Sequence, residues 1–162
     1  MSHSVTRRDF LTHAAAAVSA TALLGATSVW SAESAPLYKI SLAQWSLHRA
    51  IFGKQIDNLD FAKVSKEEFG IDAIEYVNQF FKDKAKDASY IADMKQRASD
   101  HGVRSVLIMV DGEGQLGAAD KAQRAQTVEN HKKWVEAAAE LGCHAVRVNA
   151  ASSGSYDEQV ER

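Results

Sequence analysis

Polar side chains that recognise hydroxyl groups follow each of four short apolar stretches of this sequence. They include carboxylates, amides, an imidazole, a guanidinium and an indole. The nine candidate ligand-binding residues are Gln44, Trp45, His48, Glu75, Asn78, Asp111, Glu113, Arg147 and Asn149. Carboxylates and amides hydrogen-bond hydroxyl groups, and an aromatic ring offers a flat apolar surface. The set therefore indicates a pocket for a polar small molecule.

The elements that must position these residues are predicted strands and helices in alternation. Apolar or alternating patterns predict strands over 38–45, 71–77, 103–110 and 143–149. Apolar residues at helical spacing predict helices over 57–69, 87–101 and 120–141, and each is followed by a glycine: Gly70, Gly102 or Gly142. Residues 156–162 resemble the first turns of a further helix. This alternation predicts an α/β fold with a parallel sheet, and the carboxyl ends of such strands meet at one edge.

Chain length leaves two architectures with this pattern open. Of 162 residues, roughly 125 follow the N-terminal segment, which is about half of a (β/α)8 barrel. Four units form either a small open doubly wound sheet or the first half of a barrel. We expect a half barrel to self-associate, because its edge strands and apolar interior are uncovered.

The N-terminal segment, residues 1–35, has the features of an export signal. Arg7 and Arg8 form a twin-arginine pair, and an Ala-rich apolar run follows over 14–29. That run is too short and too weakly apolar for a stable membrane span. We expect export to the periplasm by the twin-arginine pathway, with membrane contact only during transit.

Charge and the remaining motifs exclude several functions. The net charge is −2, which opposes nucleic-acid binding. A single cysteine, Cys143, excludes an internal disulfide and a multi-cysteine zinc site. Because Cys143 and His144 are adjacent on a predicted strand, they point to opposite faces and cannot share a metal. His131 lies on the apolar side of its helix near Trp134, where we predict a packing or hydrogen-bonding role.

A G-x-G-x-x-G sequence, residues 112–117, follows the third predicted strand. Such glycines can cradle a pyrophosphate at a helix N-terminus. The preceding Asp111 is a poor neighbour for a phosphate, so a glycine-rich turn is favoured over a dinucleotide site. A calcium loop starting at Asp111 would need Gly at its sixth position and Glu at its twelfth, where Leu116 and Ala122 stand.

Five stretches carry a resemblance to a known family: 41–48, 70–81, 109–117, 130–135 and 141–149. Their order and spacing resemble the xylose isomerase-like TIM barrels, and within these the exported sugar phosphate isomerase/epimerase proteins. The resemblance implies a (β/α)8 TIM-barrel fold of which about the first four βα units are present, residues 36–162. The superfamily also contains apurinic-site endonucleases, but an acidic exported chain opposes a repair role.

The resemblance also implies chemistry. It implies isomerisation or epimerisation of a sugar or polyol with a divalent metal, Mn, Mg, Zn or Co. The family's metal ligands come mostly from later strands, so no metal ligand or catalytic base is assigned in this chain. We expect the 162-residue chain alone to be inactive. The alternative is a non-catalytic carbohydrate-binding protein of the same fold.

Overall fold

A computed structural model describes residues 37–162, and the predicted export signal lies outside the described residues. Four parallel strands form one sheet in the order β1-β2-β3-β4. Their bounds are Leu42–Ala43 for β1, Ala73–Val77 for β2, Arg104–Met109 for β3 and Ala145–Arg147 for β4. The sequential order of parallel strands is that of successive right-handed βαβ units.

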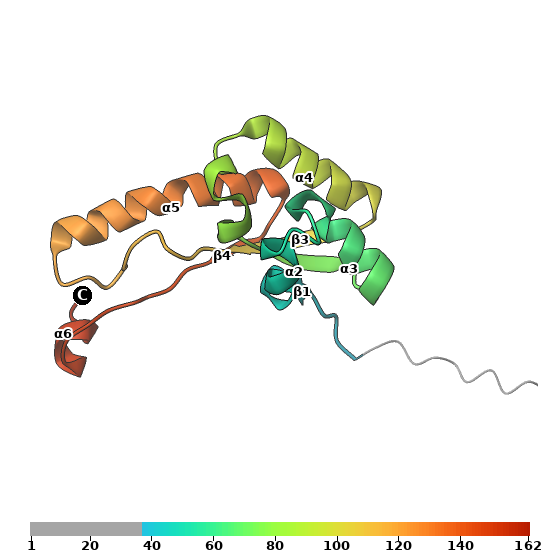
Figure 1. Ribbon diagram of the computed structural model, residues 1–162. Helices are drawn as coiled ribbons and strands as arrows, with labels where there is room; N and C mark the ends of the chain where they lie inside the picture. Colours follow the sequence, from blue (N-terminus) through green and yellow to red (C-terminus); the bar gives the residue numbers. More distant parts are fainter. Residues whose placement is uncertain (1–36) are drawn as a thin grey trace, which may run out of the picture. The chain divides into compact units, whose positions relative to one another are not determined.

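Helices alternate with these strands (Figure 1). The α-helices are α2 His48–Phe52, α3 Phe61–Phe69, α4 Ala88–Asp100, α5 Lys121–Leu141 and α6 Tyr156–Val160; the 3-10 helices are η1 Gln44–Leu47, η2 Asn58–Asp60 and η3 Asn78–Lys84. Asp87 and Asp120 cap α4 and α5 by accepting hydrogen bonds from backbone N–H groups of the first turn. Gly70 and Gly142 end α3 and α5 in the left-handed conformation, as predicted.

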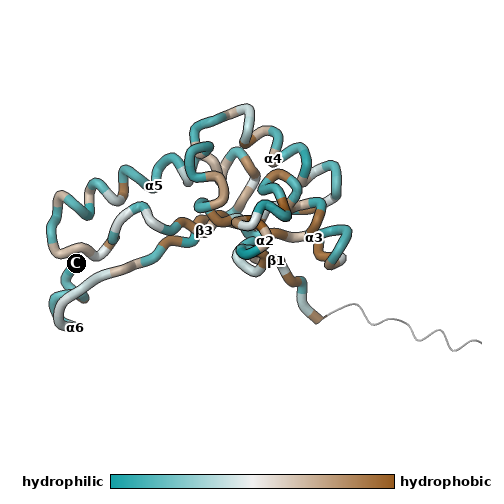
Figure 2. The backbone as a smooth tube through the Cα atoms, in the orientation of Figure 1, coloured by the Kyte–Doolittle hydropathy of each residue, from teal (hydrophilic) through white to brown (hydrophobic). Residues whose placement is uncertain are grey.

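The core lies between the sheet and helices α3, α4 and α5. Tyr76 and Ile108 of the sheet pack with Phe61, Phe81 and Trp134. Trp134 is fully buried and meets Phe81 edge to face, at 5.3 Å between ring centroids. Figure 2 shows that the most hydrophobic residues gather on the central strands, while hydrophilic and hydrophobic residues alternate along the helices.

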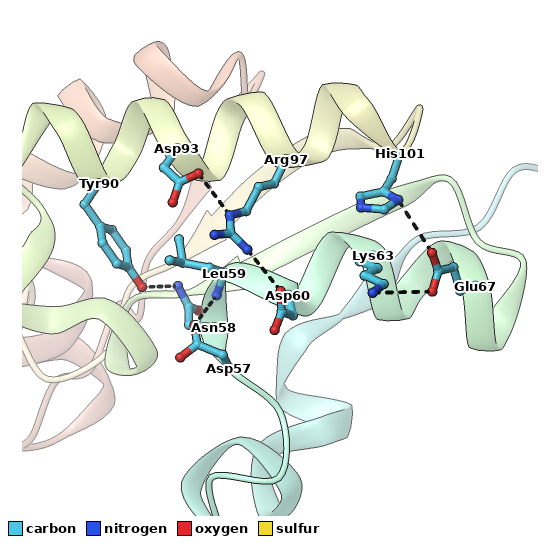
Figure 3. Close-up of polar contacts among 10 residues, drawn as sticks. All are labelled: Asp57, Asn58, Leu59, Asp60, Lys63, Glu67, Tyr90, Asp93, Arg97 and His101. Atoms are coloured by element: carbon cyan, nitrogen blue, oxygen red, sulfur yellow. Dashed lines mark hydrogen bonds and ion pairs between the residues drawn. The ribbon is translucent and has the colours of Figure 1, made fainter.

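Polar side chains also join α4 to η2, the 3-10 helix that leads into α3 (Figure 3). Arg97 of α4 contacts Asp93 on its own helix at 2.9 Å and Asp60 of η2 at 3.0 Å. These groups are about half exposed, so each pair adds little stability.

The opposite face of the sheet carries Glu75, Leu107, Met109 and Ala145, which are only half-buried. Their alternation with the buried core residues places them away from the helices. In a closed barrel this face would line the interior.

The first strand is much shorter than predicted. The alternating pattern predicts a strand through Trp45, but pairing stops at Ala43 and the chain turns into η1. At this end of the strand the Gln44 side chain, rather than a backbone carbonyl, accepts the hydrogen bond from the Val77 N–H at 2.9 Å. A side chain therefore replaces a rung of the backbone ladder.

Candidate functional site

An open cleft lies at the carboxyl ends of the strands. Its volume is about 410 Å³, and it is lined by Ala43, Trp45, Ser46, Val77, Met109, Asp111 and Arg147. Each of the four strands contributes at least one residue to this lining, and other lining residues follow directly after a strand. This is the edge at which parallel α/β sheets build their binding sites.

Asp111, Arg147 and Asn149 form a hydrogen-bonded group at this cleft. Arg147 Nη1 donates to Asp111 Oδ1 at 3.2 Å and to Asn149 Oδ1 at 2.6 Å. Asn149 Nδ2 in turn donates to Asp111 Oδ1. Arg147 keeps 42% of its side chain exposed and Asp111 keeps 25%. All three therefore combine a defined position with access for a ligand.

Trp45 provides an aromatic surface beside this group. It is 44% exposed, and the His48 ring stacks on it with centroids 4.9 Å apart and planes 10° apart. His48 Nδ1 lies 2.7 Å from the Trp45 carbonyl oxygen. Because a carbonyl only accepts, Nδ1 carries the proton in this contact, which leaves Nε2 of neutral His48 as an acceptor.

Two phenylalanines that the sequence analysis did not single out complete the aromatic cluster. Phe52 contacts Trp45 edge to face at 6.2 Å, and Phe80 lies 6.1 Å from Trp45 and 4.9 Å from Phe52. Phe52 lies on the short helix after β1 and Phe80 follows β2. Their proximity depends on the parallel pairing of these strands, so spacing alone does not reveal it.

Glu75 lies on β2, the neighbour of β1, and on the uncovered face of the sheet. Its Oε1 accepts a hydrogen bond of 2.6 Å from the Ser41 hydroxyl. Ser41 precedes β1, and both residues are half-buried. This hydrogen bond thus holds the carboxylate across the β1–β2 pair. Its second oxygen, Oε2, accepts no hydrogen bond from another of residues 37–162.

Gln44 and Asn78 lie behind the cleft wall. Both are fully buried. Gln44 Nε2 donates to Asn58 Oδ1 at 2.7 Å. Asn58 Nδ2 in turn donates to the Tyr90 hydroxyl at 2.9 Å, as Figure 3 shows. Asn78 bonds the backbone of Asp111. Their amides are taken up by protein partners, so the candidate ligand contacts reduce to the other predicted residues.

Glu113 also turns away from the cleft. It is 7% exposed, and it accepts hydrogen bonds from Trp134 Nε1 at 2.8 Å and from Lys133 Nζ at 3.1 Å. Burial alone would raise the pKa of Glu113, but these two donors outweigh it and hold the pKa below the ordinary value. Glu113 is an anchor between the glycine-rich turn and α5.

Gly114 of that turn has a packing reason. Gly114 adopts a φ of +112°, and a Cβ there would lie 2.3 Å from Thr127 Oγ1 of α5. The N-terminus of α5 is already capped by the Asp120 carboxylate, which accepts from the Gln123 N–H at 2.7 Å. A carboxylate therefore occupies the position that a pyrophosphate would need in the dinucleotide alternative.

The described residues do not supply a metal centre. Within 37–162, no group of three or more His, Cys, Asp or Glu side chains converges in a way that could hold a metal ion. The donors at the cleft thus do not fit a divalent cation by themselves.

His131, predicted to pack or to form a hydrogen bond, is buried in α5 with its Nδ1 2.7 Å from the Thr127 carbonyl. Over residues 37–162 no helix is long and apolar enough to cross a membrane.

The parallel sheet, its flanking helices and the cleft at its carboxyl edge define an α/β protein of the TIM-barrel type. Residues 62–162 match the family of xylose isomerase-like TIM barrels, and the chain belongs to this family. The predicted fold class, with about four βα units, is confirmed.

One solved structure similar to this chain is described as a crystal structure of D-psicose 3-epimerase in the presence of D-fructose. The TM-score is 0.53 at 18% sequence identity, with 77% of this chain and 44% of that chain covered. This likeness shows the fold, and the chain spans less than half the length of that enzyme. Among curated protein sequences, none matches the chain.

Proposed function

We propose that the cleft binds a free sugar or polyol as part of a sugar isomerase or epimerase. The observation that carries the proposal is the convergence of Trp45, Asp111 and Arg147 on one cleft at the carboxyl edge of the sheet. An indole stacks on the apolar face of a sugar ring, and a carboxylate with a guanidinium hydrogen-bonds vicinal hydroxyls. The family and the epimerase-like fold support the same class of ligand.

The charges at the cleft favour an unphosphorylated ligand. Arg147 is the basic residue that lines the cleft, and it is already paired with Asp111. Glu75 adds a second carboxylate on the same face of the sheet. A phosphate in the cleft would meet the Asp111 carboxylate and no unpaired cation among the lining residues, with Glu75 a further negative charge on the same face of the sheet, and like charges at short distance repel. We therefore propose a neutral sugar as the ligand.

Individual residues have distinct parts in this proposal. Asp111 accepts from sugar hydroxyls, and Arg147 and Asn149 donate to hydroxyl oxygens while they hold Asp111 in place. Trp45 stacks on the ring. His48 orients the indole by stacking on it and by its bond to the Trp45 carbonyl.

We propose further that residues 37–162 bind sugar but do not convert it. Conversion in this class then needs a divalent metal whose ligands lie outside the described residues. The absence of a converging ligand set in 37–162 and the 44% coverage of the epimerase support this division. The competing function, a non-catalytic carbohydrate-binding protein, shares the cleft and differs only in conversion.

Calorimetric titration with D-fructose tests the proposal. We expect binding to the unmodified chain that EDTA does not change and that produces no isomerised sugar by chromatography. Trp45→Ala and Asp111→Asn each weaken binding roughly tenfold, the effect of about 1.4 kcal/mol of lost contact. Tyr156→Ala and Asp100→Asn, exposed residues away from the cleft, are the matched controls. Binding abolished by EDTA, or equal losses in the controls, contradicts the proposal.

We also propose that the chain is exported and that it self-associates. The twin-arginine pair and the apolar run after it support export, and Arg7→Lys with Arg8→Lys should retain a fused reporter in the cytoplasm. The half-buried Leu107 and Met109 on the open sheet face support self-association. Light scattering after size exclusion should show a mass of at least twice 17.7 kDa. A monomer at micromolar concentration contradicts self-association.

A further inference from the structure

Asp111 lies just beyond the regular hydrogen bonding of the sheet. The β2–β3 pair ends at Val77 and Met109. The next residue, Val110, still donates its N–H to the Arg147 carbonyl at 2.8 Å. After Asp111 the chain enters the glycine-rich turn with Gly112 at a φ of +77°. Asp111 therefore stands where the ladder has stopped and a left-handed turn begins.

The side chain of Asn78 takes over where the ladder stops. Asn78 Oδ1 accepts from the Asp111 N–H at 3.0 Å, and Asn78 Nδ2 donates to the Asp111 carbonyl at 2.9 Å. Both bonds require the same orientation of the amide, since a flip would oppose two donors and two acceptors. The amide thus bonds both backbone groups of one residue, as a neighbouring strand would.

These two hydrogen bonds, here called the Asn78 clamp, are buried. Asn78 has no exposed surface, so water does not compete for its amide, and loss of either partner would leave a buried polar group unpaired. Asn78 itself follows Val77, whose N–H is held by Gln44. The end of β2 is therefore a fixed point from which the Asp111 backbone is positioned.

The consequence of the clamp appears at the Asp111 side chain. The carboxylate lines the cleft and accepts hydrogen bonds from Arg147 and Asn149 of the β4 edge. A change in the backbone dihedrals φ and ψ at Asp111 would swing the carboxylate out of this geometry. The β4 side chains hold this geometry less firmly, because both are exposed and water competes for their hydrogen bonds.

We infer that Asn78 is a positioning residue: its buried amide holds the Asp111 backbone so that the Asp111 carboxylate meets Arg147, Asn149 and the ligand in the cleft. Asn78 does this without touching the ligand. The ligand-binding part of the inference rests on the proposed function, while the structural part stands without it.

The test compares Asn78→Ala with a matched variant, Asn130→Ala. Asn130 also donates through Nδ2 to a loop carbonyl, that of Glu113 at 3.0 Å, but it lies on α5 and bonds Glu113 rather than Asp111. Three quantities are measured by NMR in each protein: hydrogen exchange of the Asp111 N–H, the positions of the Asn149 side-chain amide signals, and the dissociation constant for D-fructose.

We expect Asn78→Ala to speed exchange of the Asp111 N–H at least tenfold, to shift the Asn149 signals towards those of a free amide, and to weaken D-fructose binding about tenfold. Asn130→Ala should leave all three unchanged. Unchanged exchange and unchanged Asn149 signals in Asn78→Ala, or equal changes in both variants, overturn the inference.

Two further outcomes also decide. If Asn78→Ala does not fold, exchange in the unmodified protein is the criterion: protection of the Asp111 N–H comparable to that of Val110 supports the clamp, and exchange at the rate of an unstructured peptide overturns it. If the unmodified protein does not bind D-fructose, the proposed function fails, while the exchange and Asn149 measurements still test the positioning role.

Discussion

Replacement of Gly114 by alanine tests whether the glycine-rich turn exists for packing. A Cβ at Gly114 would lie 2.3 Å from Thr127 Oγ1 and 3.3 Å from Thr127 Cγ2, and the residue has a φ of +112°. Gly112 is the matched control, because its φ is also positive, at +77°, but a Cβ there meets nothing within 4 Å. The two substitutions differ chiefly in the clash with α5.

The magnitudes follow from these geometries. A left-handed conformation costs a residue with a Cβ about 1–2 kcal/mol, which is the whole expected cost of Gly112→Ala. Overpacking adds about 1–3 kcal/mol, so Gly114→Ala should lose about 2–5 kcal/mol. At roughly 4 °C per kcal/mol for a chain of this size, the Tm falls by about 4–8 °C for Gly112→Ala and about 8–20 °C for Gly114→Ala.

Thermal unfolding followed by circular dichroism measures both values. Thr127→Ala, made alone and with Gly114→Ala, completes a double-mutant cycle. We expect the pair to recover most of the overpacking cost of about 1–3 kcal/mol, because the closest contact, Oγ1 at 2.3 Å, is gone, while the backbone strain and the contact with the Cβ of residue 127 at 3.2 Å remain. Equal losses at Gly112 and Gly114, or no recovery with Thr127→Ala, would refute the packing explanation.

Three other predictions concern buried groups. Because the pKa of Glu113 is lowered in the folded protein, its carboxylate stabilises the fold fully above the ordinary glutamate pKa of about 4.3, and this stabilisation is lost as the pH falls through the lower folded pKa. Urea titrations of Glu113→Gln should therefore show a smaller loss of unfolding free energy below about pH 4. An unchanged dependence of stability on acid pH would contradict this. Gln44→Leu leaves the Val77 N–H without its acceptor, so chemical denaturation should show a loss of about 2–4 kcal/mol, and a loss under 1 kcal/mol would argue against the side-chain rung. Burial raises the pKa of Cys143 to about 11, so iodoacetamide at pH 8 should react about a hundredfold more slowly than with free cysteine; reaction at the free rate would show an accessible thiol.

The helices of this fold are predictable because their signals are local. Apolar spacing and the terminal glycines place α3, α4 and α5 within a few residues of their observed ends. The first strand is not predictable in the same way. Its early end depends on the Gln44 side chain reaching Val77, 33 residues away in the sequence, and no local pattern contains that contact.

In the candidate site, too, some features could be predicted from local sequence and others depend on contacts between residues distant in the sequence. Asp111, Arg147 and Asn149 could be predicted to converge, because they follow adjacent parallel strands. The burial of Gln44 and Asn78 could not, because their partners are distant in sequence. Glu113 follows the same strand as Asp111, yet the glycine turn carries it to Trp134 of α5. Position after a strand thus identifies the edge of the sheet but not the direction of each side chain.

The central claim is that the cleft at the carboxyl edge of the sheet binds a neutral sugar. The most direct measurement is NMR mapping of the unmodified protein during titration with D-fructose and, separately, with D-fructose 6-phosphate. We predict that D-fructose shifts the Trp45 indole and Asn149 amide signals in a saturable way, and that the phosphorylated sugar binds more weakly at the same residues. Tighter binding of the phosphorylated sugar, or saturable shifts confined to residues away from the cleft, would contradict the claim.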